Sequence, residues 1–377
     1  MGMPIRPSGP ARQARLRTLN LELVLDRIVD AGRPISRTEL IAATGLTRPT
    51  ITRIVNRLIE GRLVTEVSRA PGPGAGRPMI GLTLSGSGPA GLGLDIRADA
   101  LAACVVDLTG RVRHTAFLPR PADVLPRLGA MAADAVAAVA REGLTVVAAT
   151  LAVPGPVQDG VVRSAPALGW RDVDAVTPVR AAMRGLDLPV TVENEARLGA
   201  LGELYAGDPA PSGFLYVSGG LGIGTGVVLD GALMGGWRGE LGHVTVERDG
   251  PPCPCGSRGC LLGFASLPDD VFARAEADDP AALAALATAG SALGVALSGA
   301  LNLLDIRTVL LGGTFAVLSS WLTAGVRAEI GRRVPAAAWT PIAVRPSLLG
   351  PDAAAIGAAL TAIDGIRRRP SAWLGNL

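Results

Sequence analysis

The residues with the most distinctive chemistry are three cysteines in the stretch CPCGSRGC at residues 253–260. Cys253 and Cys255 are too close in sequence for an easy disulfide, and a redox pair usually has the spacing Cys-x-x-Cys. His243, one of two histidines in the chain, lies shortly before the cluster. Three thiolates and one imidazole complete a tetrahedral zinc site with no open position for water. The sequence therefore predicts a structural Zn2+ site formed by His243, Cys253, Cys255 and Cys260.

Two further groups of polar residues lie next to predicted turns. Asn194 and Glu195 follow a predicted strand in the sequence VENEA, and Glu240 shares the glycine-bearing turn RGELGH with His243. Taken one at a time, these acids are more readily explained as helix-terminal or surface charges.

The first 80 residues predict a small basic module. They contain 13 arginines against six acidic residues, a net charge of +7, whereas the remainder of the chain carries −4. Helical periodicity is expected over residues 19–30 and 36–44, the second helix starting with a Ser-x-x-Glu capping box. Gly45 then supplies a turn, and Thr47 is expected to cap a third helix that ends near Glu60. Helix, short glycine turn and helix is the arrangement of a helix-turn-helix.

The third predicted helix separates an apolar face from a polar face suited to a major groove. Strands are expected at residues 63–67 and 79–84, joined by a hairpin tip whose arginines could reach a phosphate or a minor groove. Together these features predict a winged helix-turn-helix that binds double-stranded DNA, with a purely structural helical hairpin as the alternative. The candidate DNA-contacting residues are Arg37, Arg48, Thr50, Thr52, Arg53, Asn56, Arg57, Arg69 and Arg77.

The composition of the body predicts a globular α/β protein. Predicted strands alternate with helices from Gly91 onward and lead into glycine turns, as in two-lobed nucleotide- or sugar-binding folds. Residues 280–304 carry no charge, and Asp305 follows directly after them. Their content is mostly Ala, Gly, Ser and Thr. Because lipid-facing helices hold more large apolar side chains, we expect a buried helix pair there rather than a membrane span. The N-terminus has no apolar run typical of a secretory signal, so a soluble cytoplasmic protein is expected.

Several of these motifs together resemble the ROK family of repressors, open reading frames and sugar kinases. The resemblance rests on ENEA, ELGH and CPCGSRGC, on the helix-turn-helix module, and on NLLDIRTVLLGG and LGPDAAAIGAAL near the C-terminus. It implies a two-lobed, actin-like ATPase fold of the ribonuclease H type, following a winged helix-turn-helix at residues 1–86. The ROK domain would cover residues 87–377. Its first lobe would comprise about 87–200 plus the C-terminal helix, and its second lobe about 201–354.

The resemblance also implies a sugar in the cleft between the lobes. The residues implied to face it are Asn194, Glu195, Glu240 and His243, with the loop around Gly169 nearby. Carboxylates and amides suit this role because each can bond two hydroxyls. The family places a further sugar-binding glutamate two residues after the last zinc ligand, where this chain has Leu262. That departure favours a pentose, deoxy or modified sugar, or the loss of sugar binding altogether.

A kinase function is disfavoured by residues 95–100. The family's kinases have Asp-x-Gly-Gly-Thr-Lys at this point, where glycines let the backbone approach ATP phosphates. Here the sequence is DIRADA, in which Arg97 is bulky and Asp99 is negatively charged. Glu195 also takes the place of the kinases' catalytic aspartate. We therefore expect a non-catalytic, sugar-responsive regulator, most simply a repressor acting as a homodimer or homotetramer. A sugar kinase with a fused DNA-binding domain and a ligand-free DNA-binding protein are the alternatives.

Overall fold

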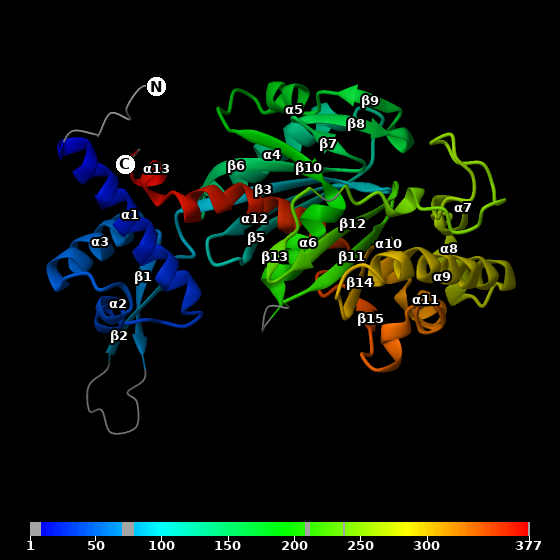
Figure 1. Cartoon of the computed structure of the whole chain (residues 1–377). Coiled ribbons are helices and arrows are strands. Elements are labelled where there is room, and N and C mark those ends of the chain that lie inside the picture. The colour runs from blue at the N-terminus through cyan, green and yellow to red at the C-terminus, as the bar shows by residue number, and fades with distance from the viewer. Residues whose placement is uncertain (1–8, 70–78, 208–211, 237, 376–377) are drawn as a thin grey trace, which may run out of the picture.

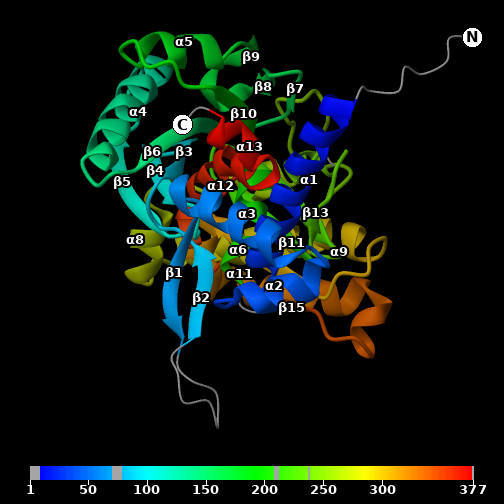
Figure 2. The ribbon, with the colours of Figure 1, turned by 90° about the vertical axis from the view of Figure 1, so that its left-hand side faces the viewer.

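The computed structural model describes residues 9–69, 79–207, 212–236 and 238–375. A small N-terminal module lies at one end of the molecule, beside two larger α/β lobes (Figure 1). The C-terminal helix returns to the N-terminal module, so the first and last described helices lie side by side in both views (Figures 1 and 2).

The N-terminal module is a winged helix-turn-helix, as predicted. It consists of α1 (Gly9–Asp30), α2 (Arg37–Thr44), α3 (Arg48–Glu60) and the antiparallel strands β1 (Val64–Arg69) and β2 (Met79–Leu84). The capping box of α2 is present, since Ser36 Oγ accepts from Glu39 N at 3.2 Å and Glu39 Oε2 accepts from Ser36 N at 2.8 Å. The apolar face of α3 is buried, with Ile51, Val55 and Leu58 at 0% exposure.

One expectation for this module is wrong. Thr47 occupies the N-cap position of α3, but its hydroxyl caps no backbone amide. It lies 3.0 Å from the hydroxyl of Thr50 instead. The Thr47 hydroxyl is therefore paired with another side chain and not with the helix backbone. What favours a helix start here is Pro49 in the first turn of α3, whose fixed φ suits a helix.

The first lobe is built on a five-stranded sheet with the order β10-β6-β3-β4-β5. Leu92 and Leu94 of β3 face a core shared with α4, whereas the alternate residues Gly91 and Gly93 contact the backbone of α12. The two helices therefore cover opposite faces of the sheet. The elements are β3 (Pro89–Ile96), β4 (Ala100–Asp107), β5 (Val112–Pro119), α4 (Val124–Ala140), β6 (Thr145–Val153), α5 (Val176–Ala182), β10 (Val190–Asn194) and α12 (Ala353–Arg368), with a small sheet of β7 (Val157–Gln158), β8 (Val161–Ala165) and β9 (Trp170–Val173) and the single turn η1 (Pro166–Leu168).

The second lobe repeats this topology. Its sheet has the order β15-β14-β11-β12-β13, so each sheet places its first strand in the middle, pairs it antiparallel with the second and parallel with the fourth. The helix α6 (Glu195–Ala206) packs against both α12 and β12, and the expected boundary near residue 200 falls inside it. The strands are β11 (Phe214–Gly219), β12 (Ile223–Leu229), β13 (Ala232–Leu233), β14 (Thr308–Gly313) and β15 (Ala343–Pro346), and the remaining elements are η2 (Leu241–His243), α7 (Leu262–Ala265), α8 (Val271–Glu276), α9 (Pro280–Leu301), α10 (Thr314–Val317), α11 (Ser319–Arg333), η3 (Pro335–Ala338) and η4 (Gly350–Asp352).

The apolar segment after Pro280 forms one helix, α9, and not the expected helix pair. Its glycines serve close packing instead of a turn, because a side chain at Gly290 or Gly294 would meet the backbone of α11 at 2.8–2.9 Å. The helix α9 is long and apolar enough to cross a membrane, but 56% of its most apolar 18-residue stretch is buried inside the protein. That burial is typical of a core helix.

The C-terminal helices connect the first lobe to the DNA-binding module. The short helix α13 (Pro370–Leu374) follows α12 and packs against α1. Leu374 lies in the same hydrophobic cluster as Leu25 of α1, and the indole Nε1 of Trp373 donates to the carbonyl of Gly61 at 2.7 Å. The N-terminal module is thus anchored to residues more than 300 positions away in the chain.

Candidate metal centre, interlobe pocket and DNA-facing helix

The structure brings His243 and the three clustered cysteines together. Their ligand atoms all lie within 4.8 Å of one another, with Cys255 Sγ 3.8 Å from Cys260 Sγ and Cys253 Sγ 3.5 Å from His243 Nδ1. A tetrahedral zinc ion with Zn–S distances of about 2.3 Å would place sulfur atoms about 3.8 Å apart, and a sulfur and a nitrogen about 3.6 Å apart. The donor set and its spacing therefore fit a four-coordinate metal ion.

Local backbone bonds shape this centre. Cys253 N donates to Ser257 O at 2.9 Å and Gly256 N donates to Cys253 O at 3.0 Å, which closes a tight turn around two of the thiols. Thr245, two residues after His243, pairs with Cys260 in an isolated β-bridge. This bridge brings the third cysteine close to the η2 turn, which ends at His243. The turn chemistry that the glycines and prolines predict thus positions all four side chains.

The imidazole of His243 joins the metal centre to a carboxylate. Nδ1 faces Cys253, whereas Nε2 lies 4.0 Å from Glu240 Oε2. A metal ion held through Nδ1 would fix the ring and direct Nε2 toward that acid. Burial raises the pKa of Glu240, and Arg238 offsets part of this rise.

A pocket of about 450 Å³ lies between the lobes. Asp95, Glu195 and Ser218 provide part of its polar wall, at the ends of β3, β10 and β11. Burial raises the pKa of Glu195 to about 8, with further repulsion from Asp95 and Glu240, although Ser218 donates a hydrogen bond to the ionised form. The apolar residues of its lining include Leu262 and Phe272.

The other residues expected to bind sugar lie outside the lining of this pocket. Asn194 is 4% exposed, and its side chain accepts from Ala196 N and Arg197 N while donating to the carbonyl of Gly155 at 2.9 Å. It therefore caps α6 and ties that helix to the turn after β6. Gly169 ends the short η1 turn, with φ of +68°. Glu195 alone, of the five residues, lines the pocket as described.

Arg97 lines the pocket in the segment that resembles the kinase phosphate loop. Its Nε donates to Asp95 Oδ2 at 3.0 Å and its Nη2 donates to Asp352 Oδ1 at 2.8 Å. The guanidinium also stacks 5.1 Å from the ring of Phe117. Burial raises the pKa of Asp95 even though Arg97 opposes the rise. The sequence predicted a bulky cation here but gave no signal for Asp352, which is 255 residues away.

The exposed side of α3 forms a shallow groove on the surface of the N-terminal module. The predicted residues Thr52, Arg53, Asn56 and Arg57 are all exposed, as is Arg48 at the helix start. Arg37 of α2 pairs with Glu66 of β1 at 2.8 Å, so its charge is partly neutralised. Arg77 lies outside the residues that the structure describes, and no side-chain placement is described for Arg69.

Comparisons with known proteins agree with the division into two parts. The family model described as "ROK family" matches residues 91–364, and the one described as "MarR family" matches residues 23–77. The xylose repressor of Bacillus subtilis is 28% identical and the alignment covers 94% of this chain and 97% of that protein. The glucokinase of Streptomyces coelicolor is 33% identical, over 46% of this chain and 56% of that protein.

Two solved structures have the same fold. A ROK family transcriptional regulator, described as a homolog of the E. coli MLC protein, gives a TM-score of 0.75 at 24% identity and covers 96% of this chain and all of that one. A glucokinase from Streptomyces griseus, in complex with glucose and AMPPNP, gives a TM-score of 0.60 at 27% identity. It covers 73% of this chain and all of that one.

Proposed function

The chain belongs to the ROK family, and from that premise we propose that it is a sugar-responsive transcriptional repressor of carbohydrate-utilisation genes. The observation that carries the proposal is a DNA-binding module joined to a ROK domain. In that domain Arg97, which pairs with Asp95 and Asp352, occupies the segment that resembles the kinase phosphate loop. Its site of action would be the cytoplasm, where operator DNA is accessible.

The proposed contact with DNA is made by α3. Arg48, Arg53 and Arg57 stand on its exposed face, where arginine can bond guanine edges or clamp phosphates. A homodimer or homotetramer would present two copies of α3 to the half-sites of a palindrome, with the wing on the flanking backbone.

The proposed metal is a structural zinc ion held by His243, Cys253, Cys255 and Cys260. Support comes from the donor set of three thiolates and one imidazole, and from distances between the donor atoms that match a tetrahedral ion. The ion would supply a rigid junction rather than reactivity. The protein's own contribution is the orientation of His243 Nε2 toward Glu240.

The proposed effector is a neutral sugar that contacts Glu195 in the pocket and extends past the pocket lining to Glu240, which interacts electrostatically with Glu195, and to His243, with Asn194 and Gly169 shaping the surrounding loops. Leu262 places an apolar side chain in the pocket lining, which suits a sugar with fewer hydroxyl groups on that side. The xylose repressors among the relatives make D-xylose the first sugar to test. A bound effector can release DNA only if its affinity differs between the two conformations of the repressor.

Sugar phosphorylation is the second candidate, because Glu195 is a half-buried carboxylate with a raised pKa in a pocket that Gly219, Gly220 and Gly222 also line. Against it, Arg97 and Asp99 line the pocket where a polyphosphate would need backbone amides. We therefore propose that the protein does not catalyse this reaction.

The decisive experiment has three measurements on the purified full-length chain. Binding to its own upstream DNA should weaken as the salt concentration rises, and it should also weaken when D-xylose is added. A sugar that binds the native state should raise the melting temperature. A coupled assay for ADP should remain at background with D-xylose and D-glucose, and turnover on either sugar would replace the repressor assignment with the kinase.

A further inference from the structure

The helix α12 runs from the interlobe pocket to the DNA-binding module. Its 16 residues span about 24 Å at the rise of an α-helix. Ala354 in its first turn lines the pocket, as does Pro351 of the preceding turn η4, whereas Ile363, near its end, belongs to the hydrophobic cluster of the N-terminal module. One rigid element therefore touches both places where the proposed function requires binding.

The pocket end of α12 is held by a charge pair. Asp352, the residue immediately before α12, accepts from Arg97 at 2.8 Å, and the same guanidinium bonds Asp95. Arg97 is 16% exposed and Asp95 only 4%, so their ion pair is shielded from salt, whereas Asp352 is 44% exposed. All three residues belong to the pocket or adjoin it, which places the pair within reach of a bound ligand.

The middle of α12 is packed too closely to move independently of its neighbours. Ala358 forms a buried cluster with Leu198 of α6, the helix that begins with Glu195. Gly93 of β3 meets the backbone of α12 at Ala355 on the adjoining side. Because close-packed interiors transmit displacement, a shift at the start of α12 must be carried along the helix.

The far end of α12 is bound to the DNA-binding module at several points. Ile363 and Ile366 pack in the same hydrophobic cluster as Leu25 of α1, and Arg367 donates to the carbonyl of Leu108, a first-lobe residue in that cluster. Beyond α12, Leu374 is buried against the module and Trp373 bonds Gly61, which directly follows α3. A displacement of α12 would therefore reach the end of the helix that is proposed to contact DNA.

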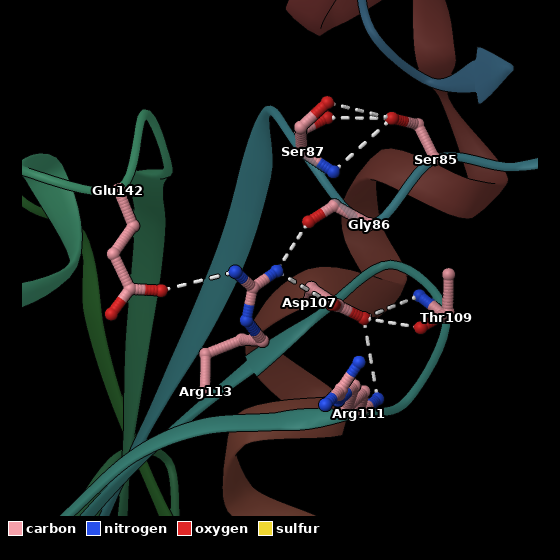
Figure 3. Close-up of polar contacts among 8 residues, drawn as sticks. All are labelled: Ser85, Gly86, Ser87, Asp107, Thr109, Arg111, Arg113 and Glu142. Atoms are coloured by element: carbon pink, nitrogen blue, oxygen red, sulfur yellow. Dashed lines mark hydrogen bonds and ion pairs between the residues drawn. The ribbon is translucent and has the colours of Figure 1, made fainter.

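The covalent linker between the two parts is also fixed. Arg113 donates to the carbonyl of Gly86 at 2.5 Å and to Asp107 at 3.2 Å, and its other amino group pairs with Glu142 (Figure 3). Ser85 Oγ accepts from Ser87 N at 3.1 Å in the same linker (Figure 3). This clamp restricts free rotation of the module, so motion is passed on rather than lost in a loose hinge.

We propose that Arg97 is a positioning residue which, through Asp352, sets the placement of α12 and couples the pocket to α3. This inference rests on the proposed repressor function. Arg97 and Ala354 of α12 line the same pocket as Glu195, so a ligand that occupies this part of the pocket would favour one placement of the helix over another. Coupling then follows from the difference in ligand affinity between the two placements.

The test compares Asp352→Asn with Asp364→Asn. Asp352→Asn keeps the side-chain shape but removes the charge that pairs with Arg97. Asp364→Asn is the matched control, since Asp364 lies on α12 and pairs with Arg368, 2.6 Å away, on the same helix. Both variants are first checked for wild-type circular dichroism.

The coupling measurement is the affinity for the upstream duplex with and without saturating D-xylose. We expect the wild type to lose at least fivefold in DNA affinity, within the usual range of allosteric coupling. Asp352→Asn should reduce that factor to below twofold while changing D-xylose affinity by less than threefold. Asp364→Asn should keep the wild-type factor. Equal coupling in all three proteins, or equal loss in both variants, would overturn the inference.

A second measurement needs neither DNA nor sugar, which separates this inference from the proposed function. Hydrogen exchange in Asp352→Asn should be at least threefold faster across residues 353–374 and in the part of α1 that contacts α13. Asp364→Asn should not affect α1. Faster exchange confined to residues 349–356 would refute the coupling role even if the protein neither bound DNA nor responded to D-xylose.

Discussion

Replacement of single cysteines offers a direct test of the proposed zinc centre. The three cluster cysteines differ in burial, because Cys260 is fully buried and Cys255 is exposed, while the fourth cysteine, Cys104, is buried in β4 away from the cluster. Cys255→Ser and Cys260→Ser each remove one thiolate. Cys104→Ser is the matched control because it makes the same substitution outside the donor set.

The expected size of the effect follows from the four-ligand geometry. A structural zinc site supplies about 10–16 kcal/mol, so one of four ligands accounts for about 3 kcal/mol. That loss corresponds to about a hundredfold weaker zinc binding. At Cys255 a water molecule can approach the exposed position and replace part of the bond. At Cys260 the neighbouring protein excludes water, so this variant should lose more zinc and more stability.

The assay is zinc content by elemental analysis after dialysis against a chelator of graded strength, together with the melting temperature. We expect one zinc per chain in the wild type and in Cys104→Ser, less in Cys255→Ser and least in Cys260→Ser. Retention of one zinc per chain by both cluster variants would refute the metal assignment. Equal zinc loss in Cys104→Ser would instead show that the ion is lost through general destabilisation.

Three further outcomes follow from the structure. In an anisotropy titration, the double variant Arg53→Ala/Arg57→Ala should bind the upstream duplex at least a hundredfold more weakly, and its binding should depend less on salt. The control Arg141→Ala, at the exposed end of α4, should bind normally in the same titration. Burial raises the pKa of Glu195 from 4.5 to about 8, so its contribution to stability is present below pH 4.5 and is lost as the pH rises toward 8. Thermal unfolding should therefore show Glu195→Gln to be more stable than the wild type at pH 8.5 and similar to it at pH 5; the same difference at both values would contradict the raised pKa. Arg113→Ala should lower the free energy of unfolding by about 2 kcal/mol in urea, because it removes a charged partner of the buried Asp107. Arg111→Ala should have little effect, since Arg111 bonds Asp107 through its backbone amide.

Much of the N-terminal module was predictable because its signals are local. The capping box of α2 and the buried face of α3 depend on residues three or four positions apart, which periodicity detects directly. The errors have local causes too. Thr47 resembles a cap but bonds Thr50, and the segment expected to form a helix pair is the single helix α9, whose Gly290 and Gly294 allow close contact with α11. Sequence pattern shows that a small residue is needed without showing whether a turn or a neighbour requires it.

The candidate site was predictable only where its residues are close in sequence. His243 and the cysteines lie within 18 positions and converge on one centre. The pair of Arg97 with Asp352 joins residues 255 positions apart and has no motif of its own. The role of Asn194 as a helix cap also depends on three-dimensional contacts, because the same amide could equally have faced a sugar.

The placement of α12 has a consequence for biosynthesis. The first lobe is discontinuous, since one face of the sheet containing β3 is covered by residues 353–368, which the ribosome makes after every strand of the two lobe sheets. Until they emerge, Gly91, Gly93 and the surrounding strand surface lack their partner, while the second lobe can already form its own sheet. Closure of the first lobe must therefore wait until residues 353–368 emerge, and it spans a separation of more than 250 residues, which slows folding. A chain interrupted before α12 would expose this face and would be a substrate for chaperones and proteases.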